Sequence, residues 1–351
     1  MDAALTRQNS WLFSREIDLT VFLGSAVLSL LLLALGSQLG ILNGESPDWT
    51  WVSAVLLIDV AHVWSTSFRV YFDKAEFKRR FWLYVLVPAA GYALSVALYS
   101  EGSLTFWKVL ALLAVFHFVR QQYGWVALYR RKAGETSRLT RWIDAVAVYL
   151  ATIYPLAFWM TRLPRNFEWF VQNDFVSVPS VVEQVLFPVY VLALIVYFGK
   201  SVYQYAATGF ANVGKDIVVA TTVICWYVGI VVFNSDYAFT VTNVIIHGVP
   251  YFALIYVYAR VRREETGRIY KAMSSHWIVF LASLWAIAYV EELFWDRGVW
   301  HDHAWLFGAG WEWSSTIQML VVPLLALPQL THYVLDGFIW RRRGNPDLKF
   351  L

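Results

Sequence analysis

Long runs of apolar residues recur along the whole chain and are separated by shorter polar stretches. Runs of about 20 such residues are long enough for an α-helix to cross the hydrocarbon core of a bilayer. The pattern predicts an all-α, polytopic membrane bundle of about ten transmembrane helices. They are expected at 17–42, 49–72, 82–99, 104–129, 142–161, 181–198, 216–234, 238–259, 276–294 and 314–339. No internal repeat or soluble segment interrupts the pattern, so we expect residues 1–351 to form one integral-membrane domain.

The polar stretches between these runs alternate in charge. The basic ones carry Arg7, Arg15, Lys74, Lys78, Arg79, Arg80, Arg130, Arg131, Lys132, Arg138, Arg141, Lys200, Lys215, Arg260, Arg262, Arg263, Arg268, Lys271, Arg341, Arg342, Arg343 and Lys349. The others carry mainly Glu45, Asp48, Glu101, Glu168, Asp174, Asp236, Asp296 and Asp302. Because basic loops stay on the cytoplasmic side, this alternation predicts that both termini are cytoplasmic. We expect a bacterial inner-membrane protein.

The composition agrees with a membrane protein and excludes several other classes. The chain is 59% hydrophobic and 15% charged, whereas soluble domains carry about 25% charged residues. The net charge of +3 reflects basic residues beside the apolar runs, so we expect no nucleic-acid partner. The single cysteine, Cys225, excludes disulfides within the chain and cysteine-based metal clusters.

Four of the seven histidines lie inside apolar runs: His62, His117, His247 and His332. They occupy the second, fourth, eighth and tenth runs, which all cross the membrane in the same direction. Counting to the next charged residue that follows each one places all four roughly 14–20 Å above the cytoplasmic end. The four imidazoles can therefore converge if these helices are neighbours.

Each of these histidines has a polar companion one helical turn away. Asp59 precedes His62, Gln121 follows His117, Asn243 precedes His247, and Asp336 follows His332. Spacings of three or four residues place both side chains on one face of a helix. A purely structural interpretation is that each histidine forms a hydrogen bond between helices. Four at one depth favour a shared metal site, with ligands drawn from His62, His117, His247, His332, Asp59 and Asp336.

The type of ligand narrows the choice of metal. Imidazole and carboxylate suit non-heme iron, zinc or manganese, and an open site of this kind on iron can activate dioxygen. Iron, as one or two ions, is therefore our first expectation, with zinc or manganese as alternatives. Arg120 and Gln121 lie three and four residues after His117, so we expect them near a bound substrate as catalytic residues. Glu291 and Glu292 are expected to be solvated residues at a helix end.

These features predict a membrane-embedded non-heme iron oxidoreductase. Its substrate would be a hydrophobic, lipid-like small molecule that enters from the membrane lipids, and the reaction would be hydroxylation, desaturation or oxidative cleavage. An oxidative reaction would take electrons from an external donor. Two alternatives stay open. One is a haem-binding electron-transfer protein, since histidines on facing helices can be axial ligands. The other is a proton-coupled transporter with a buried His/Asp relay.

Overall fold

The computed structural model describes residues 11–43, 46–341, 345 and 348. Within these residues the chain forms helices and no strand, which confirms the all-α prediction. Ten helical spans are long and apolar enough to cross a membrane. Five residues that enter the charge pattern lie outside the described residues: Arg7, Glu45, Arg342, Arg343 and Lys349.

The ten spans follow the predicted runs in order. Spans 1 to 5 are Arg15–Gln38 (containing α1, Arg15–Asp18, and α2, Ser25–Gln38), Asp48–Arg69 (α3, Asp48–Thr50, and α4, Ala61–Arg69), α6 (Phe81–Glu101), α7 (Ser103–Lys132) and α8 (Arg138–Met160). Spans 6 to 8 are α9 (Ser180–Thr208), Val213–Val232 (α10, Val213–Trp226) and Asp236–Glu265 (α11, Asp236–Arg262). Spans 9 and 10 are Trp277–Trp300 (α13, Trp277–Trp295) and Ser315–Ile339 (α15, Ser315–Leu325, and α16, Leu327–Ile339).

Several span ends differ from the predicted runs by four to ten residues, and two of the differences have clear local causes. The sixth span ends at Thr208 instead of 198, because the helix continues until Gly209 takes a left-handed conformation with φ +67°. The tenth run is divided at Ala326 into α15 and α16. Pro328 lies in the first turn of α16 and has no amide hydrogen to donate to the preceding turn, so the helix is interrupted there.

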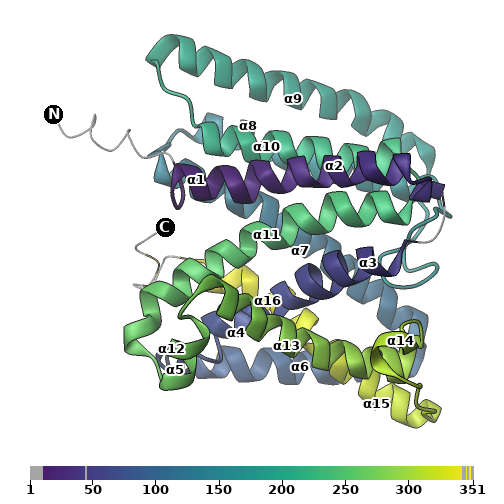
Figure 1. Ribbon diagram of the computed structural model, residues 1–351. Coiled ribbons are helices and arrows are strands. Elements are labelled where there is room, and N and C mark those ends of the chain that lie inside the picture. The colour runs from purple at the N-terminus through teal and green to yellow at the C-terminus, as the bar shows by residue number, and fades with distance from the viewer. Residues whose placement is uncertain (1–10, 44–45, 342–344, 346–347, 349–351) are drawn as a thin grey trace.

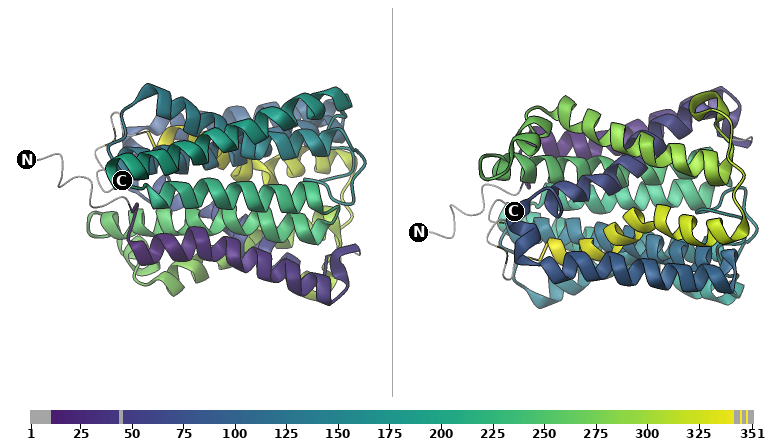
Figure 2. Two further views of the ribbon diagram at one scale, coloured as in Figure 1. Left: turned by 90° about the horizontal axis from the view of Figure 1, so that it is seen from above. Right: turned by 90° about the horizontal axis from the view of Figure 1, so that it is seen from below.

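Helix α11 is the axis of the bundle. In its most apolar stretch 89% of the residues are buried, compared with 11% for both α6 and α9. Figure 1 shows α11 crossing the middle of the molecule, with α9 along one edge and α6 along the opposite edge. The views in Figure 2 show the spans running side by side. A residue on α11 can therefore meet partners from several other helices.

The short helices α5 (Lys74–Arg79) and α12 (Arg268–Met273) lie at one end of the bundle, and α14 (Ala304–Phe307) lies at the other (Figure 1). At the basic end, Asp73 caps α5 and accepts hydrogen bonds from Arg262 Nε and Tyr258 OH, each at 2.8 Å. Burial alone would raise the pKa of Asp73, but these hydrogen bonds and the charge of Arg262 lower it. Asp73 therefore stays ionised at neutral pH and ties the second span to α11.

Candidate metal centre

The four intramembrane histidines meet in the interior of the bundle. His62 on α4, His117 on α7, His247 on α11 and His332 on α16 each offer one ring nitrogen, and these nitrogens all lie within 4.8 Å of one another. No side chain among the four is more than 2% exposed. Helices that are far apart in the sequence thus place four imidazoles at one point.

Within two pairs of histidines, the spacing of the nitrogens suits ligands of a single ion. The Nε2 atoms of His62 and His247 lie 3.1 Å apart, as do those of His117 and His332. Two nitrogens that bind one ion at about 2.0–2.1 Å lie roughly 2.9–3.4 Å apart for bond angles between 90° and 109°. The four residues therefore form a group that could hold a metal ion.

Close helix packing brings His62 and His247 together. Gly248 follows His247 on α11, and a β-carbon added there would lie 2.5 Å from Ile58 Cγ2 and 3.7 Å from His62 Cβ. Only glycine allows the two backbones to approach this closely. The segment before α4, Trp51–Val60, is π-helical, a distortion that is frequent at functional sites. Phe118 fixes the ring of His247 from its other face, with centroids 3.5 Å apart and planes 6° from parallel.

The outer ring nitrogens face oxygen atoms. His62 Nδ1 lies 3.5 Å from Asp59 Oδ1, and His117 Nδ1 lies 3.9 Å from Asp336 Oδ2. His332 Nδ1 forms a 2.7 Å hydrogen bond with Thr66 Oγ1. Within the part of the chain that the structure describes, the Nδ1 atoms of His62 and His247 have no hydrogen-bond partner. The hydroxyl of Thr66 can hold His332 in the tautomer with the proton on Nδ1.

A directional chain of hydrogen bonds supports this tautomer for His332. Thr66 Oγ1 lies 3.1 Å from Tyr251 OH, and Tyr251 OH donates to Asp336 Oδ1 at 2.7 Å. If His332 Nδ1–H donates to Thr66, the hydroxyl of Thr66 donates to Tyr251, and the chain ends on a carboxylate. The Nε2 lone pair of His332 then points towards Nε2 of His117, 3.1 Å away. Two facing lone pairs at this distance repel unless a proton or a metal ion lies between them.

The two carboxylates in the predicted ligand set lie on the outer side of the imidazoles. Asp59 and Asp336 are not among the four residues whose donor atoms converge. Asp336 accepts from Trp340 Nε1 and from Tyr251, both at 2.7 Å, which fixes its carboxylate behind His117. In these positions the carboxylates can orient metal-bound imidazoles and make them more basic.

Gln121 and Arg120 have different surroundings. Gln121 is buried and donates to the backbone oxygen of His247 at 3.2 Å, which links α7 to α11 beside the centre. Arg120 lies on the outside of α7, donates to Tyr149 OH and stands 5.2 Å from the ring centroid of Tyr123. Asn243 donates to Phe239 O and Thr242 Oγ1 on its own helix.

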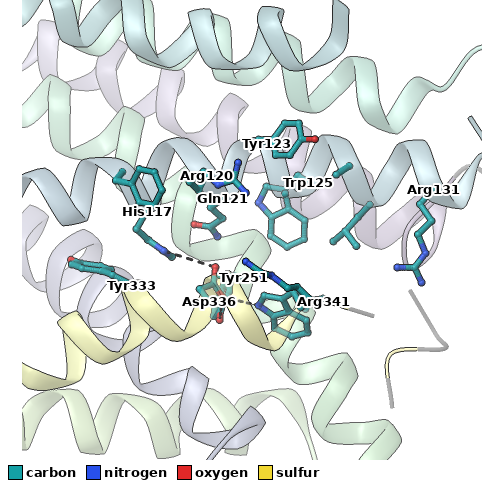
Figure 3. A pocket seen from close by; sticks show the side chains of 17 residues that line it. His117, Arg120, Gln121, Tyr123, Trp125, Arg131, Tyr251, Tyr333, Asp336 and Arg341 are labelled. Atoms are coloured by element: carbon teal, nitrogen blue, oxygen red, sulfur yellow. Dashed lines mark hydrogen bonds and ion pairs between the residues drawn. The ribbon is translucent and has the colours of Figure 1, made fainter. Parts of the chain in front are cut away.

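A cavity of about 340 Å³ adjoins the centre (Figure 3). It lies between α7 and α16, with Tyr251 and Leu254 of α11 in its wall. His117, Gln121 and Asp336 line it, as do Arg120, Arg131 and Arg341. Tyr333, also in the wall, stacks on His117 with ring centroids 5.0 Å apart. The cavity therefore gives space for a ligand beside one of the four histidines.

Several residues near the centre were absent from the predicted site. Thr66 follows His62 by four residues and Tyr251 follows His247 by four, so the same spacing rule that selected Gln121 would have found both. The expectation for Glu291 and Glu292 is wrong. Both are only 6% exposed, because the ninth span continues to Trp300, and Glu291 accepts from the indoles of Trp64 and Trp295.

Comparison with known proteins found no matching family model, no similar curated protein and no similar solved structure.

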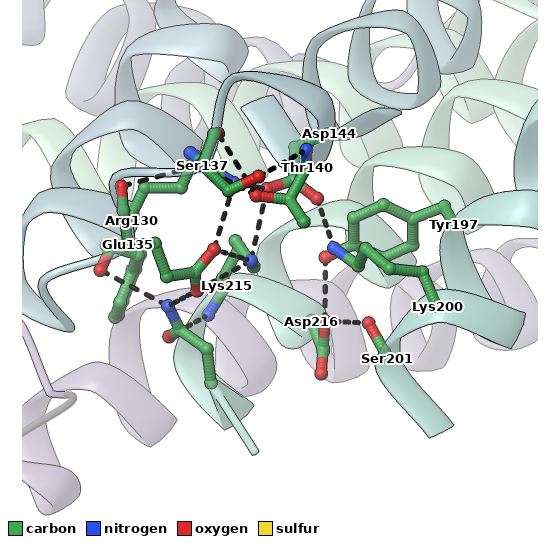
Figure 4. A network of polar contacts seen from close by, with 12 residues as sticks. Arg130, Glu135, Ser137, Thr140, Asp144, Tyr197, Lys200, Ser201, Lys215 and Asp216 are labelled. Atoms are coloured by element: carbon green, nitrogen blue, oxygen red, sulfur yellow. Dashed lines mark hydrogen bonds and ion pairs between the residues drawn. The ribbon is translucent and has the colours of Figure 1, made fainter. Parts of the chain in front are cut away.

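A second buried polar cluster lies at the basic end of the bundle (Figure 4). Asp144 on α8 accepts from Arg130, Lys200 and Lys215, which come from α7, α9 and α10. Glu135 accepts from Lys215 Nζ at 2.7 Å and from Arg130 at 2.9 Å. Each of these five charged side chains faces one of opposite sign, so the cluster joins four helices.

We predict that Asp144→Asn destabilises the fold. Removing the carboxylate takes away the ion-pair partner of Lys200 and one of two anions that face Arg130 and Lys215. Breaking a buried ion pair typically costs about 3–5 kcal/mol of unfolding free energy. The apparent melting temperature in detergent should fall clearly below that of the unchanged protein. Glu264→Gln is the control, because Glu264 pairs with Lys271 on the surface and should leave the melting temperature unchanged. Equal melting temperatures for Asp144→Asn and the control would contradict the structural role.

We also predict that Thr66→Val weakens metal binding. The change removes the hydrogen-bond partner of His332 Nδ1, and losses of this kind lower metal affinity by about 10–100-fold. Affinity can be measured by competition with a chelator. Thr152→Val is a matched control, because the Thr152 hydroxyl donates only to the backbone of its own helix. An affinity for Thr66→Val equal to that of the control would show that Thr66 does not orient His332.

Proposed function

We propose that the protein is a membrane-embedded, metal-dependent oxidoreductase that acts on a hydrophobic, lipid-like substrate. The observation that carries this proposal is the convergence of His62, His117, His247 and His332, with their Nε2 atoms turned inward and oxygen atoms behind three of the four rings. Four neutral imidazoles that present lone pairs to one point in a buried site are a donor set for a metal ion.

Iron is the metal that we propose, as one non-heme ion. Donor atoms within 4.8 Å of one another surround a single point, whereas paired ions lie about 3.5–4 Å apart and are usually bridged by carboxylates. Four imidazoles leave positions open on a six-coordinate iron, where dioxygen can bind. Imidazole also suits zinc, so elemental analysis decides the identity of the metal, with zinc or manganese as the alternative results.

The reaction that we propose is hydroxylation, desaturation or oxidative cleavage. Hydroxylation and desaturation by dioxygen consume a pair of electrons and a pair of protons, and one or both oxygen atoms leave as water. Cleavage that places both oxygen atoms in the products consumes no electrons. The first two reactions would therefore depend on an external electron donor. Bound iron would supply the dioxygen chemistry, and the protein would hold the substrate beside it.

The residues around the centre have distinct roles in this proposal. The four histidines hold the metal, and Asp59 and Asp336 orient His62 and His117 through Nδ1. Gln121 positions His247 by donating a hydrogen bond to the backbone oxygen of His247. Arg120 lies in the cavity wall beside His117, where it can contact a substrate. We further propose that the basic end of the bundle is cytoplasmic, which would place both termini in the cytoplasm of a bacterial cell.

The decisive prediction concerns metal content. Purified protein should contain one transition-metal ion per chain, and both His117→Ala and His332→Ala should lose it, because each removes a ligand from the shared site. Inductively coupled plasma mass spectrometry on all samples measures this directly. His276→Ala is the control, since His276 lies exposed at the start of α13 and should retain the metal.

Two results would count against the proposal. A purified protein without stoichiometric metal would remove it, as would full metal retention in both His117→Ala and His332→Ala. Stoichiometric zinc in place of iron would retain the metal site and remove the oxidative reaction.

A proton-coupled transporter is the second candidate, and one observation favours it. Glu291 and Glu292 are buried in the ninth span, and this span packs against the second span, which carries Asp59. Buried carboxylates near histidines are what a proton relay requires. Metal-free protein with substrate-dependent proton uptake would favour this candidate. A haem is less favoured, because Nε2 atoms 3.1 Å apart leave no gap for a macrocycle between two axial ligands.

A further inference from the structure

The cavity beside His117 combines a basic wall with an apolar one (Figure 3). Three arginines line it, Arg120, Arg131 and Arg341, against one carboxylate, that of Asp336. The Asp336 carboxylate already accepts from Tyr251 and Trp340. Aromatic and aliphatic side chains complete the lining, among them Phe116, Trp125 and Leu128. The cavity thus has the two kinds of surface that an amphipathic anion requires.

Arg120 lies in this wall far from both ends of α7. It lies seventeen residues after the start of α7 and twelve before its end, about 26 Å and 18 Å along the helix axis. An arginine at such a depth is costly unless a partner compensates its charge. Its contacts in the described part of the chain are with Tyr149 OH and the ring of Tyr123, and no carboxylate there pairs with it. Arg69, by contrast, is fully buried and pairs with Glu76 at 3.3 Å.

Two buried polar atoms of the cavity wall have no hydrogen-bond partner in the described part of the chain. Trp125 is 2% exposed, and its Nε1 has no hydrogen-bond acceptor among the described residues. Gln121 Oε1 is likewise without a partner in that part of the chain. Phe116, next to His117, is 61% exposed on the outside of the bundle, so the cavity reaches a surface that faces lipid. A ligand can therefore extend an apolar tail past Phe116 into the bilayer.

Two glycines keep the cavity open. Gly124 on α7 and Gly337 on α16 both line it, and a β-carbon added at either would meet no atom within 4 Å. A larger residue at these positions would therefore fill the cavity without disturbing the helices. This provides a way to block the cavity while leaving the metal ligands intact.

We propose that this cavity binds a single-chain amphiphile with an anionic head, a carboxylate or a phosphate, held by Arg120 and Arg341. The head lies between the arginines, and the apolar chain runs past Phe116 to the lipid. That this amphiphile is the substrate rests on the proposed function of the histidine centre, because His117 and Asp336 lie in the same wall. Binding itself requires only the cavity and its arginines.

Equilibrium binding to the purified, metal-analysed protein in phosphatidylcholine nanodiscs tests the proposal. The probes are tritiated oleate, oleyl phosphate and oleyl alcohol, which share one apolar chain. At least one anionic probe should bind about tenfold or more tightly than the alcohol, as a charge-assisted hydrogen bond provides. Whether oleate or oleyl phosphate binds more tightly distinguishes a carboxylate from a phosphate head.

Variants locate the binding in the cavity. Arg120→Gln should remove most of the preference for the anionic probe, and Gly337→Leu should abolish binding of all probes. Gly199→Leu is the matched control, because Gly199 on α9 is exposed, has open space around it and is not in the cavity wall. Three results would overturn the proposal. They are equal affinity for oleyl alcohol and both anionic probes, the absence of saturable binding, and an Arg120→Gln variant that binds the anionic probes as tightly as the unchanged protein. The metal content of the same samples is measured as well. If the metal is present but no anion binds, the proposed anion site is wrong and the proposed metal centre is retained.

Discussion

The convergence of four imidazole Nε2 atoms in the interior of the bundle is the constraint on which the rest of the structure depends. His332 Nδ1 is hydrogen-bonded to Thr66, the carboxylates of Asp59 and Asp336 lie behind His62 and His117, and the Nε2 atoms lie 3.1 Å apart within two pairs. A cation at the centre would satisfy all four nitrogens at once. A metal ion would therefore be part of the fold as well as of the chemistry.

The architecture around this centre follows from the need to bring four distant segments to one point. Helix α11 is buried along most of its length and carries His247 in the middle of the bundle. Gly248 has no side chain that would keep the second span away, and the segment of that span before α4 is π-helical. The ionic cluster around Asp144 joins α7 to three neighbours at the basic end of the bundle.

Sequence patterns sufficed for the spans and for the four histidines, because both depend on properties that are local in the chain. Apolar length specifies a span, and the distance of each histidine from the next charge specifies its depth. Local sequence patterns do not specify the direction in which a side chain points within the bundle. Asp59 and Asp336 share a helical face with their histidines, yet only the packing of α4, α7 and α16 decides which side of the ring each carboxylate faces. The burial of Glu291 likewise depends on a span end that apolar length did not define.

X-ray absorption spectroscopy at the metal edge of the purified protein tests whether the four histidines bind one ion, because it reports the atoms bound to that ion. We expect a shell of nitrogen neighbours at about 2.0–2.2 Å, with the outer-shell scattering that imidazole rings produce, at a number consistent with four histidines. A shell dominated by oxygen without imidazole scattering, or the absence of any metal edge, would contradict it.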